Sequence, residues 1–365
     1  MSLFPKRVKR PSPYNKLMTA VTQLVNNNNV QMTDSLEKDI PTHWEKRGLL
    51  VLLPGNCFTD EVWRQFDKEL WMVVSKCLNC KQLAKKDTIS KDGFRTPQVT
   101  LLYGDNPWVE CVENGIKYTY DITKCMFSAG NITEKMRISK FDCSEEIVVD
   151  LYAGIGYFTL PYLVHAKAKH LHACEWNPNA VEALKKNLKL NKVEDRCSVY
   201  QGDNRQMCPK MVADRVNLGL IPSSENGWPV ACEALKPTGG FLHIHSNVET
   251  KTKIESESRI ENLENQDDTK TESKDHHNTE ILVSDLKSKL NTSESHDTHD
   301  VNHKTLDKKK MWSMWAEEVS GKINKLMCSI HSTTNWSVTI CHIEHVKSYA
   351  PHVDHVVLDL ECRPI

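Results

Sequence analysis

The segment most informative about the fold reads Val149-Asp150-Leu151-Tyr152-Ala153-Gly154-Ile155-Gly156-Tyr157-Phe158. An apolar strand at 147–149 leads into this segment, and a helix is expected from Tyr157 onward. Because the two glycines have no side chain, a ligand can approach the backbone closely at this turn. A dinucleotide site would need a third glycine three residues later, but that position is Thr159. The segment therefore predicts either a ligand-binding turn of another kind or a glycine turn that only joins strand to helix.

Strands and helices alternate on both sides of this turn. Such alternation is typical of a parallel sheet whose strands are joined by right-handed helical crossovers. The sequence therefore predicts an α/β fold. Strands are expected at 147–149, 170–174, around Val199, 216–221 and 241–245, helices at 179–190 and 311–330, and a closing strand pair at 338–342 and 356–360.

Polar side chains stand where three of the predicted strands end. Asp150 ends the first strand, and Glu175 ends the second, twenty-five residues later. In sheets of this type an acidic residue at the second strand end accepts hydrogen bonds from ribose hydroxyls. Asp203 and Asn204 follow the third strand, where a carboxylate and an amide suit the edge of an adenine. The alternative for Glu175 is a capping or solvated carboxylate, but all these groups meet at one sheet edge, which favours a binding site.

The remainder of the chain divides by composition. Residues 1–40 read as a tail and one helix with Leu17, Val21 and Leu24 on one face, and residues 41–126 as a small α+β domain with possible tRNA contacts. Residues 249–310 contain no Phe, Trp, Tyr, Gly, Pro or Cys. Such a segment buries too little apolar surface to offset its ordering entropy, so we expect a disordered polar insertion. The binding domain is then 127–248 together with 311–365.

Bulk composition narrows the class of protein. The formal net charge is −1, so the chain as a whole is not a general polyanion binder, although Lys6–Arg10 is a basic cluster that suits either nucleic acid or a solvated tail. No leader peptide or membrane-spanning run is predicted. Thirteen cysteines without a regular framework indicate reduced thiols and a cytoplasmic protein. The single CxxC at 77–80 lacks a second pair at zinc spacing, so no metal is expected.

Taken together, these residues resemble class I S-adenosylmethionine-dependent transferases. Within that class the chain is similar to the wybutosine-synthesising tRNA aminocarboxypropyltransferases. The resemblance implies a Rossmann-like, class I methyltransferase-type sheet with a smaller N-terminal α+β domain, and S-adenosylmethionine as the donor substrate. The motifs that carry it, besides 150–158, are 52–54, 114–116, 125–135, 175–178, 202–204, 219–224 and 352–355.

The resemblance also implies a reaction and a set of site residues. The reaction transfers the 3-amino-3-carboxypropyl group to C7 of 4-demethylwyosine at position 37 of tRNA(Phe), in its anticodon loop, and releases 5′-methylthioadenosine. No membrane and no obligate protein partner are implied. Ser128 and Lys135 are our candidates for holding the amino-acid end of the donor, and a surface lysine is the alternative for Lys135. No catalytic base is identified. The predicted donor-binding residues are Ser128, Lys135, Asp150, Gly154, Gly156, Glu175, Asp203 and Asn204.

Two other functions compete with this one. The first is a tRNA guanine-37 N1-methyltransferase of the same fold. Those enzymes carry an Asn-Leu-Pro-type segment after the fourth strand, whereas here Asn217-Leu218 is followed by Gly219. The second is a non-catalytic RNA-binding protein that keeps only the form of a donor pocket; the intact polar strand ends argue against it. The N-terminus is short for the family, which predicts that part of an RNA-binding region is missing.

Overall fold

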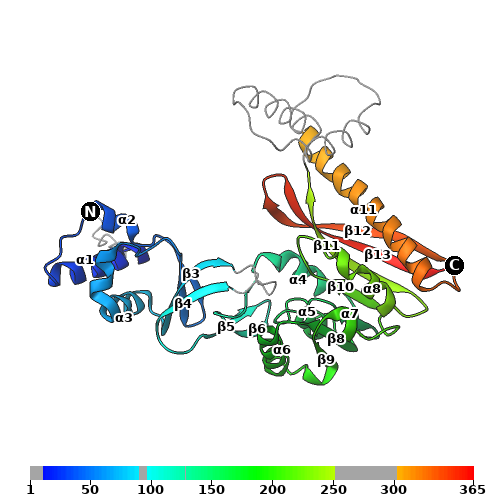
Figure 1. The fold of residues 1–365 in the computed structure, drawn as a ribbon, viewed down its shortest axis with the longest axis horizontal. Coiled ribbons are helices and arrows are strands. Elements are labelled where there is room, and N and C mark those ends of the chain that lie inside the picture. Colours follow the sequence, from blue (N-terminus) through cyan, green and yellow to red (C-terminus); the bar gives the residue numbers. More distant parts are fainter. Residues whose placement is uncertain (1–10, 90–96, 128, 251–301) are drawn as a thin grey trace, which may run out of the picture.

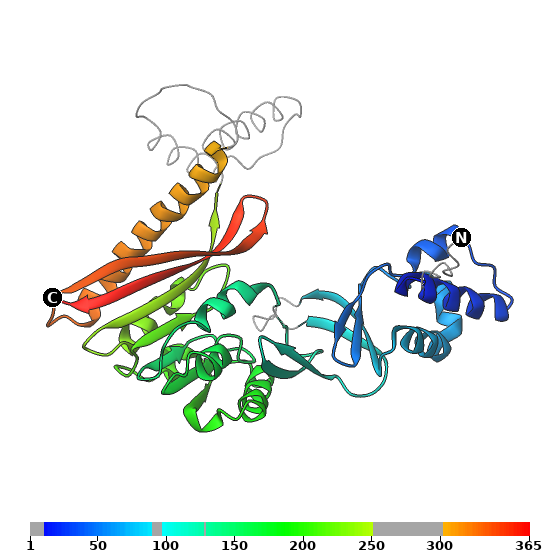
Figure 2. The ribbon, with the colours of Figure 1, turned by 180° about the vertical axis from the view of Figure 1, so that it is seen from behind.

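The structure is a computed structural model that describes residues 11–89, 97–127, 129–250 and 302–365. Two lobes lie side by side in an elongated molecule (Figure 1). The N-terminal lobe reaches to the end of β4 (Pro97–Tyr103), and the hairpin of β5 (Trp108–Glu113) and β6 (Ile116–Asp121) connects it to the larger C-terminal lobe. Figure 2 shows the same arrangement from behind.

The N-terminal lobe packs helices against a four-stranded sheet of order β1-β2-β3-β4. The apolar stripe at Leu17, Val21 and Leu24 is buried in its core, which confirms the predicted helix. Strands β2 and β3 are parallel, and the other two pairs are antiparallel. Its elements are α1 (Pro13–Asn27), α2 (Asp34–Asp39), β1 (Glu45–Arg47), β2 (Leu50–Leu53), η1 (Glu61–Phe66), α3 (Asp67–Leu78), β3 (Gln82–Ile89) and β4.

Two features of this lobe differ from the sequence analysis. The apolar positions between 61 and 78 predict one helix, but the chain forms η1 and then α3, with Asp67 at a φ of 36° between them. The break lets Trp63 turn inward, where its Nε1 donates a 2.8 Å hydrogen bond to Asp39. Strand β3 was not predicted, because its polar stretch of lysines and aspartate shows no apolar alternation. Its neighbours in the sheet stabilise it instead.

The β5–β6 hairpin connects the N-terminal lobe to the C-terminal lobe. Its turn is made by Asn114 and Gly115, both at positive φ, as the glycine turn predicts. The hairpin lies against α6 (Pro178–Leu190), where Thr119 N donates a 2.6 Å hydrogen bond to Asn187 Oδ1. Tyr118 and Tyr120 are buried in the same apolar cluster as Val148 of the large sheet. The hairpin is therefore continuous with the core of the C-terminal lobe.

The C-terminal lobe is built on a seven-stranded sheet of order β12-β13-β11-β10-β7-β8-β9. Strands β7 to β11 pair in parallel, and β13 lies antiparallel between β11 and β12. This confirms the α/β sheet and the closing strand pair. The strands are β7 (Ile147–Asp150), β8 (His170–Glu175), β9 (Cys197–Gln201), β10 (Arg215–Leu218), β11 (Gly240–Glu249), β12 (Trp336–Ala350) and β13 (Val353–Pro364).

Helices cover both faces of this sheet. Val148 belongs to an apolar cluster with side chains of α5 and α6, whereas its neighbour Val149 belongs to one with side chains of α8 and α11. Successive strand residues point to opposite faces, so a parallel strand buried on both faces is expected to be mainly apolar. The helices are α4 (Ile132–Ile138), α5 (Thr159–Val164), α6, α7 (Asn204–Met207), α8 (Trp228–Ala234) and α11 (Asn302–Ile330), with short turns η2 (Ala129–Asn131), η3 (Glu194–Arg196) and η4 (Glu225–Gly227).

The predicted insertion at 249–310 is too long at both ends. Thr250 is buried, and its N donates a 2.8 Å hydrogen bond to His352 O. Residues 302–310 form the first turns of α11, which lies along the β12–β13 pair (Figure 1). These turns are polar and were missed because they carry no apolar stripe of their own. Residues 251–301 lie outside the described residues. None of the helices that the structure describes is long and apolar enough to span a membrane.

Candidate functional site

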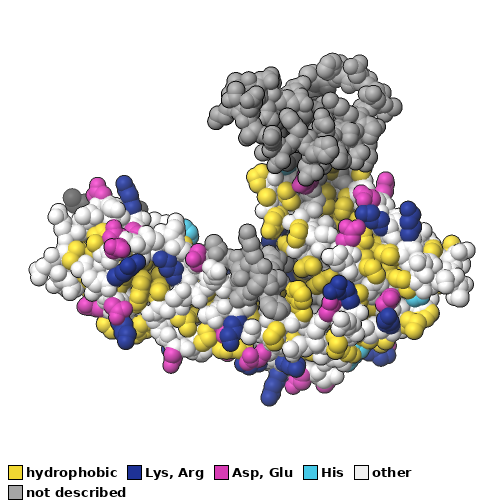
Figure 3. Space-filling view, in the orientation of Figure 1, with side chains coloured by type: hydrophobic (Ala, Val, Ile, Leu, Met, Phe, Trp, Pro, Cys, Tyr) yellow, Lys and Arg dark blue, Asp and Glu magenta, His cyan; other side chains and the backbone are white. Residues whose placement is uncertain are grey.

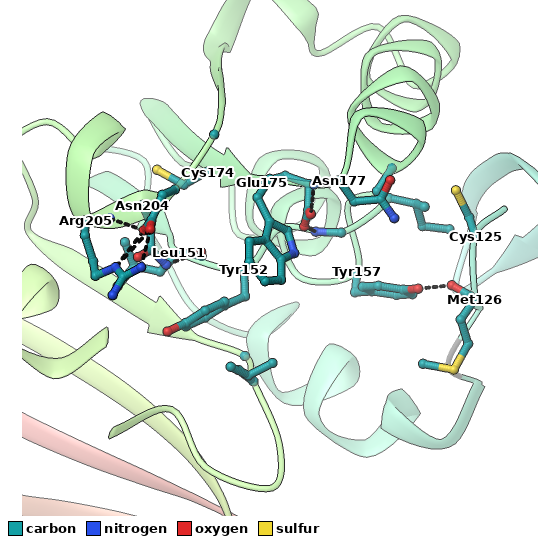
Figure 4. Close-up of a pocket in the computed structure, with 18 of the residues that line it drawn as sticks. Cys125, Met126, Leu151, Tyr152, Tyr157, Cys174, Glu175, Asn177, Asn204 and Arg205 are labelled. Carbon is teal, nitrogen blue, oxygen red and sulfur yellow. Dashed lines mark hydrogen bonds and ion pairs between the residues drawn. The ribbon is translucent and has the colours of Figure 1, made fainter. Parts of the chain in front are cut away.

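A cavity of about 400 Å³ opens at the carboxyl ends of β7, β8, β9 and β10. In parallel α/β sheets, this edge is where ligands bind. Met126 and Tyr157 stand on one side of the cavity and Asn204 and Arg205 on the other (Figure 4). The lining residues are Cys125, Met126, Leu151, Tyr152, Gly154, Ile155, Tyr157, Cys174, Glu175, Trp176, Asn177, Ala180, Gly202, Asp203, Asn204, Arg205, Gly219, Leu220 and Asn226.

The two glycines of the turn have different roles. Gly154 lines the cavity at a φ of 56°, and a Cβ there would overlap the Tyr157 ring. Gly156 has a φ of 103° and packs against Leu160 and Leu184. It lies behind the cavity wall rather than in it. Gly154 thus gives a ligand access to the backbone, while Gly156 permits close packing of the turn.

Glu175 lies at the end of β8 and contributes its carboxylate to the cavity wall. Its Oε2 accepts a 2.8 Å hydrogen bond from Gly154 N, and its Oε1 accepts one of 2.8 Å from Asn177 N. Each carboxylate oxygen has a second lone pair, so the group can also accept hydrogen bonds from a pair of hydroxyls. Burial raises the pKa of this carboxyl, and the backbone hydrogen bonds oppose that effect. The geometry suits the two hydroxyls of a ribose.

Asp203 and Asn204 reach the cavity from the start of α7. Asp203 caps the helix by accepting a 3.0 Å hydrogen bond from Arg205 N, and its carboxylate also pairs with the Arg205 side chain. The Arg205 guanidinium lowers the pKa of the Asp203 carboxyl. Asn204 Nδ2 donates a 3.0 Å hydrogen bond to Leu151 O, next to the glycine turn. This wall of the cavity is therefore polar and is tied to the end of β7.

Asp150 is fully buried and does not line the cavity. Thr159 Oγ1 donates a 2.8 Å hydrogen bond to its Oδ2, and Asn217 Nδ2 donates one of 3.0 Å to its Oδ1. Burial raises the pKa of the carboxyl. These bonds connect β7 with the first turn of α5 and with β10. Asp150 therefore supports the glycine turn from behind the cavity wall and does not contact the cavity itself.

Lys135 is buried and does not line the cavity either. Its side chain is only 2% exposed, so a surface lysine is excluded. Nζ lies 2.5 Å from Glu113 Oε2 and stands over the rings of Phe127 at 4.8 Å and Tyr157 at 5.7 Å. Burial lowers the pKa of the ammonium, and the hydrogen bond to Glu113 opposes that effect. Because Tyr157 itself lines the cavity, Lys135 stands in the layer behind it.

Ser128, the other residue predicted to hold the amino-acid end of the donor, lies outside the described residues. Several cavity residues were not singled out from the sequence. Tyr152 and Tyr157 were within the quoted turn, where their proximity to the glycines was the available signal. For Asn177 the available signal was its position two residues after Glu175. Arg205 and Asn226 come from the short helical turns α7 and η4, which carry no distinctive spacing. Within the part of the chain that the structure describes, no group of three or more His, Cys, Asp or Glu side chains is placed to hold a metal ion.

Comparison with known proteins identifies relatives over almost the whole chain. Residues 109–273 match the TRM5/TYW2 methyltransferase domain, and residues 28–107 match the TYW2 N-terminal domain. The tRNA wybutosine-synthesizing protein 2 homolog of Danio rerio is 47% identical over 362 residues, covering 99% of this chain and 81% of that protein.

Solved structures agree with this result. P. horikoshii TYW2 in complex with MeSAdo superimposes with a TM-score of 0.59 at 26% identity, covering 95% of this chain and 99% of that one. M. jannaschii TYW2 in complex with AdoMet gives a TM-score of 0.52 at 25% identity, covering 88% and 100%. The class I methyltransferase-type fold is thereby confirmed.

Proposed function

Because the chain belongs to the tRNA wybutosine-synthesizing protein 2 family, we propose that it is the aminocarboxypropyltransferase of wybutosine synthesis. The chain is an S-adenosylmethionine-dependent transferase that acts on tRNA. In the proposed reaction it transfers the 3-amino-3-carboxypropyl group of S-adenosylmethionine to C7 of 4-demethylwyosine at position 37 of tRNA(Phe). The other product is 5′-methylthioadenosine.

The observation that carries this proposal is the position of Glu175 beside the glycine turn. Its carboxylate is held by the Gly154 and Asn177 amides at the wall of a cavity of about 400 Å³. That volume falls in the range of small-molecule sites. The ribose of the donor would lie against Glu175, and the adenine would lie between the turn and the α7 wall of Asp203 and Asn204.

The chemistry depends on which carbon of the donor faces the acceptor. The positive sulfur of S-adenosylmethionine makes all three attached carbons electrophilic. In aminocarboxypropyl transfer, C7 of the base forms a bond to the chain carbon next to sulfur. The bond from that carbon to sulfur breaks, its electron pair stays on the sulfur as a neutral thioether, and C7 loses a proton. Orientation of the donor therefore selects the product.

The protein's part in this reaction is to hold the donor and present one carbon. Gly219 and Leu220 line the cavity after β10, at the position where the related methyltransferases carry a proline. We propose that Lys135 and Ser128 act on the amino-acid end of the donor. Lys135 would do so through the layer that contains Tyr157, since its ammonium is 5.7 Å from that ring.

Product analysis tests the proposal directly. The protein is incubated with S-adenosylmethionine and tRNA(Phe) that carries 4-demethylwyosine. Release of 5′-methylthioadenosine supports aminocarboxypropyl transfer, whereas S-adenosylhomocysteine identifies a methyltransferase. The third possibility is a non-catalytic RNA-binding protein, which would bind tRNA and release neither product. Calorimetric titration with S-adenosylmethionine decides whether such a protein still binds the donor.

The finer assignments belong to the same proposal. We propose that the anticodon loop of tRNA(Phe) is the bound part of the substrate, that the domain at 41–126 contacts the tRNA, and that the protein works in the cytoplasm. We propose a donor-binding domain of residues 127–248 and 311–365, to which the last residue of β11 and the first turns of α11 are added. Activity on tRNA(Phe) against other tRNAs, and the loss of tRNA affinity on removing the N-terminal lobe, are the measurements that check these assignments.

A further inference from the structure

Three strands of the large sheet extend well beyond its carboxyl edge. Leu218, the last residue of β10, pairs with Ile244, but β11 continues for five more residues to Glu249. There its strand partner is β13, which in turn pairs with β12, and Ser246 also forms an isolated bridge with Ser223. We call this part the strand extension; it comprises residues 245–249, 345–350 and 353–357. It rises from the edge of the sheet that carries the donor cavity.

The strand extension is attached to one lip of the cavity through β11. Asn247 N donates a 2.8 Å hydrogen bond to Pro222 O, and Ser246 Oγ donates one of 3.3 Å to the same oxygen. Pro222 is two residues after Leu220, which lines the cavity. The base of the extension therefore continues directly from the cavity wall.

The other lip of the cavity is reached through Lys347 of β12. A Cβ on Gly130 would collide with Lys347 Nζ, so the ammonium lies directly against the backbone of η2. Gly130 is four residues after Met126, a lining residue. Lys347 also lies close enough to His355 to lower the pKa of that imidazole. The extension thus contacts chain segments that adjoin both lips of the cavity.

Exposed apolar side chains lie here beside the half-buried Lys347. Tyr349 is 50% exposed, and among the residues that the structure describes none hydrogen-bonds its hydroxyl. Ile132 and Met136 are about two-fifths exposed and lie one turn apart on α4, which contacts β12. Figure 3 shows apolar side chains gathered over the hairpin of β12 and β13, beside the hollow between the lobes.

The cation of this surface is Lys347. The buried Asp354 pairs with Lys308 at 3.2 Å and with His345 at 3.4 Å, on the side that faces α11. Glu344 bonds to His342 at 2.8 Å. Within the described ranges no carboxylate forms an ion pair with Lys347. Its positive charge is therefore available to an external anion.

We propose that the strand extension is a binding surface for unpaired RNA, in which Tyr349 stacks on a base and Lys347 pairs with a phosphate. The inference rests on the proposed function, because a tRNA substrate supplies the RNA, and it adds the residues that hold it. Proteins that bind single-stranded nucleic acid combine basic side chains that follow the backbone with aromatic side chains on which bases stack. A duplex keeps its bases stacked inside and has none to offer Tyr349.

Binding measurements with four variants of the full chain test this surface. The probes are an unmodified tRNA(Phe) transcript and a blunt RNA duplex with the same number of phosphates. Tyr349→Ala should weaken tRNA binding roughly five- to one-hundred-fifty-fold, since a stacked base contributes about 1–3 kcal/mol, and should leave duplex binding unchanged. Tyr349→Phe keeps the ring and should bind as the parent does.

Lys347→Met should weaken the binding of both RNAs and reduce the slope of log affinity against log salt by about 0.7–0.9. Lys325→Met on α11 is the matched control for loss of one exposed lysine, and it should not change the slope for tRNA. Calorimetry with S-adenosylmethionine should give parent affinity for all four variants, which shows that the donor site is intact.

The inference is overturned if Tyr349→Ala and Lys347→Met bind tRNA as tightly as the parent, or if Tyr349→Ala weakens tRNA and duplex equally. It is also overturned if either variant changes size in gel filtration without changing RNA affinity, because the surface would then serve contacts between copies of the chain. The proposed function fails on a different observation, the absence of 5′-methylthioadenosine from parent reactions. RNA affinities of the variants decide the inference in either case.

Discussion

Replacing Glu175 with alanine tests the nucleoside end of the donor site. The carboxylate accepts 2.8 Å hydrogen bonds from Gly154 N and Asn177 N and faces the cavity. Glu175→Ala removes the acceptor for the ribose hydroxyls and leaves two backbone amides without their partner. A hydrogen bond to a charged group contributes about 1.5–3 kcal/mol, so loss of one such bond to the donor should lower S-adenosylmethionine affinity roughly ten- to one-hundred-fifty-fold.

A second variant separates shape from charge. Glu175→Gln keeps the length of the side chain, but an amide has one oxygen where the carboxylate has two acceptors. One of the two backbone N–H groups would then face an NH₂ group, so we expect a loss of affinity comparable to that of alanine rather than recovery. Glu182→Gln is the matched control, because it also removes one negative charge from this lobe. Glu182 is exposed on α6, where it pairs with Lys186 at 2.8 Å.

The assay is calorimetric titration with S-adenosylmethionine, preceded by thermal unfolding without ligand. The unfolding curve is needed because the same carboxylate holds the turn. Parent affinity in a folded Glu175→Ala protein would refute the assignment of this residue to the ribose. A loss of affinity in Glu182→Gln equal to that in Glu175→Gln would refute the assignment as well, since the effect would then come from net charge alone.

Three further predictions follow from the buried groups and the chain between β11 and α11. Lys135→Met should lower donor affinity and transfer rate together and leave tRNA affinity nearly unchanged. Adding Glu113→Gln removes the negative charge that the first substitution leaves without a partner. Parent kinetics in that double variant would exclude a role for the lysine. Replacing 251–301 with a Gly/Ser linker should preserve melting temperature and activity, whereas deleting 250–309 should lower the melting temperature because it removes a buried residue and the start of α11; equal melting temperatures would contradict this. Burial lowers the pKa of His355 to about 4, against roughly 6.5 in the unfolded chain, so its stability contribution is complete above pH ~6.5 and about 3 kcal/mol is lost as the pH falls to 4. His355→Gln should reduce the slope of the unfolding free energy against pH between these values, as measured by urea titration, and an unchanged slope would contradict the assignment.

The large sheet was predictable from the sequence, whereas much of the smaller lobe was not. Strand β7 is buried on both faces and reads as an apolar run that ends at Asp150. Strands β8, β10 and β11 carry polar residues between their apolar ones, and their positions were predicted from the apolar residues and from the alternation with helices. Strand β3 has no such run, because the consecutive polar residues Lys85, Lys86 and Asp87 interrupt it. Its place in the sheet depends on pairing with β2 and β4, and pairing between distant segments leaves no local pattern.

The site was predictable to the extent that strand ends define it. Glu175, Asp203 and Asn204 line the cavity because the carboxyl ends of parallel strands meet at one edge. Arg205 also lines it, but its neighbour Asp203 anchors it by an ion pair that the sequence does not reveal. The aromatic walls at Tyr152 and Tyr157 depend on how the glycine turn folds back, which local spacing does not specify.

Asp150 and Lys135 show that the charge of a side chain does not by itself predict contact with a ligand. Both were predicted to bind the donor, and both lie behind the cavity wall. A charged group removed from water must be paired or hydrogen-bonded, or it shifts to its neutral form. Asp150 meets this need with Thr159 and Asn217, and Lys135 meets it with Glu113. Their partners come from three other elements, so each charge connects the wall to its support. Loss of either group should therefore reach the donor through movement of the wall, which makes donor affinity and melting temperature fall together.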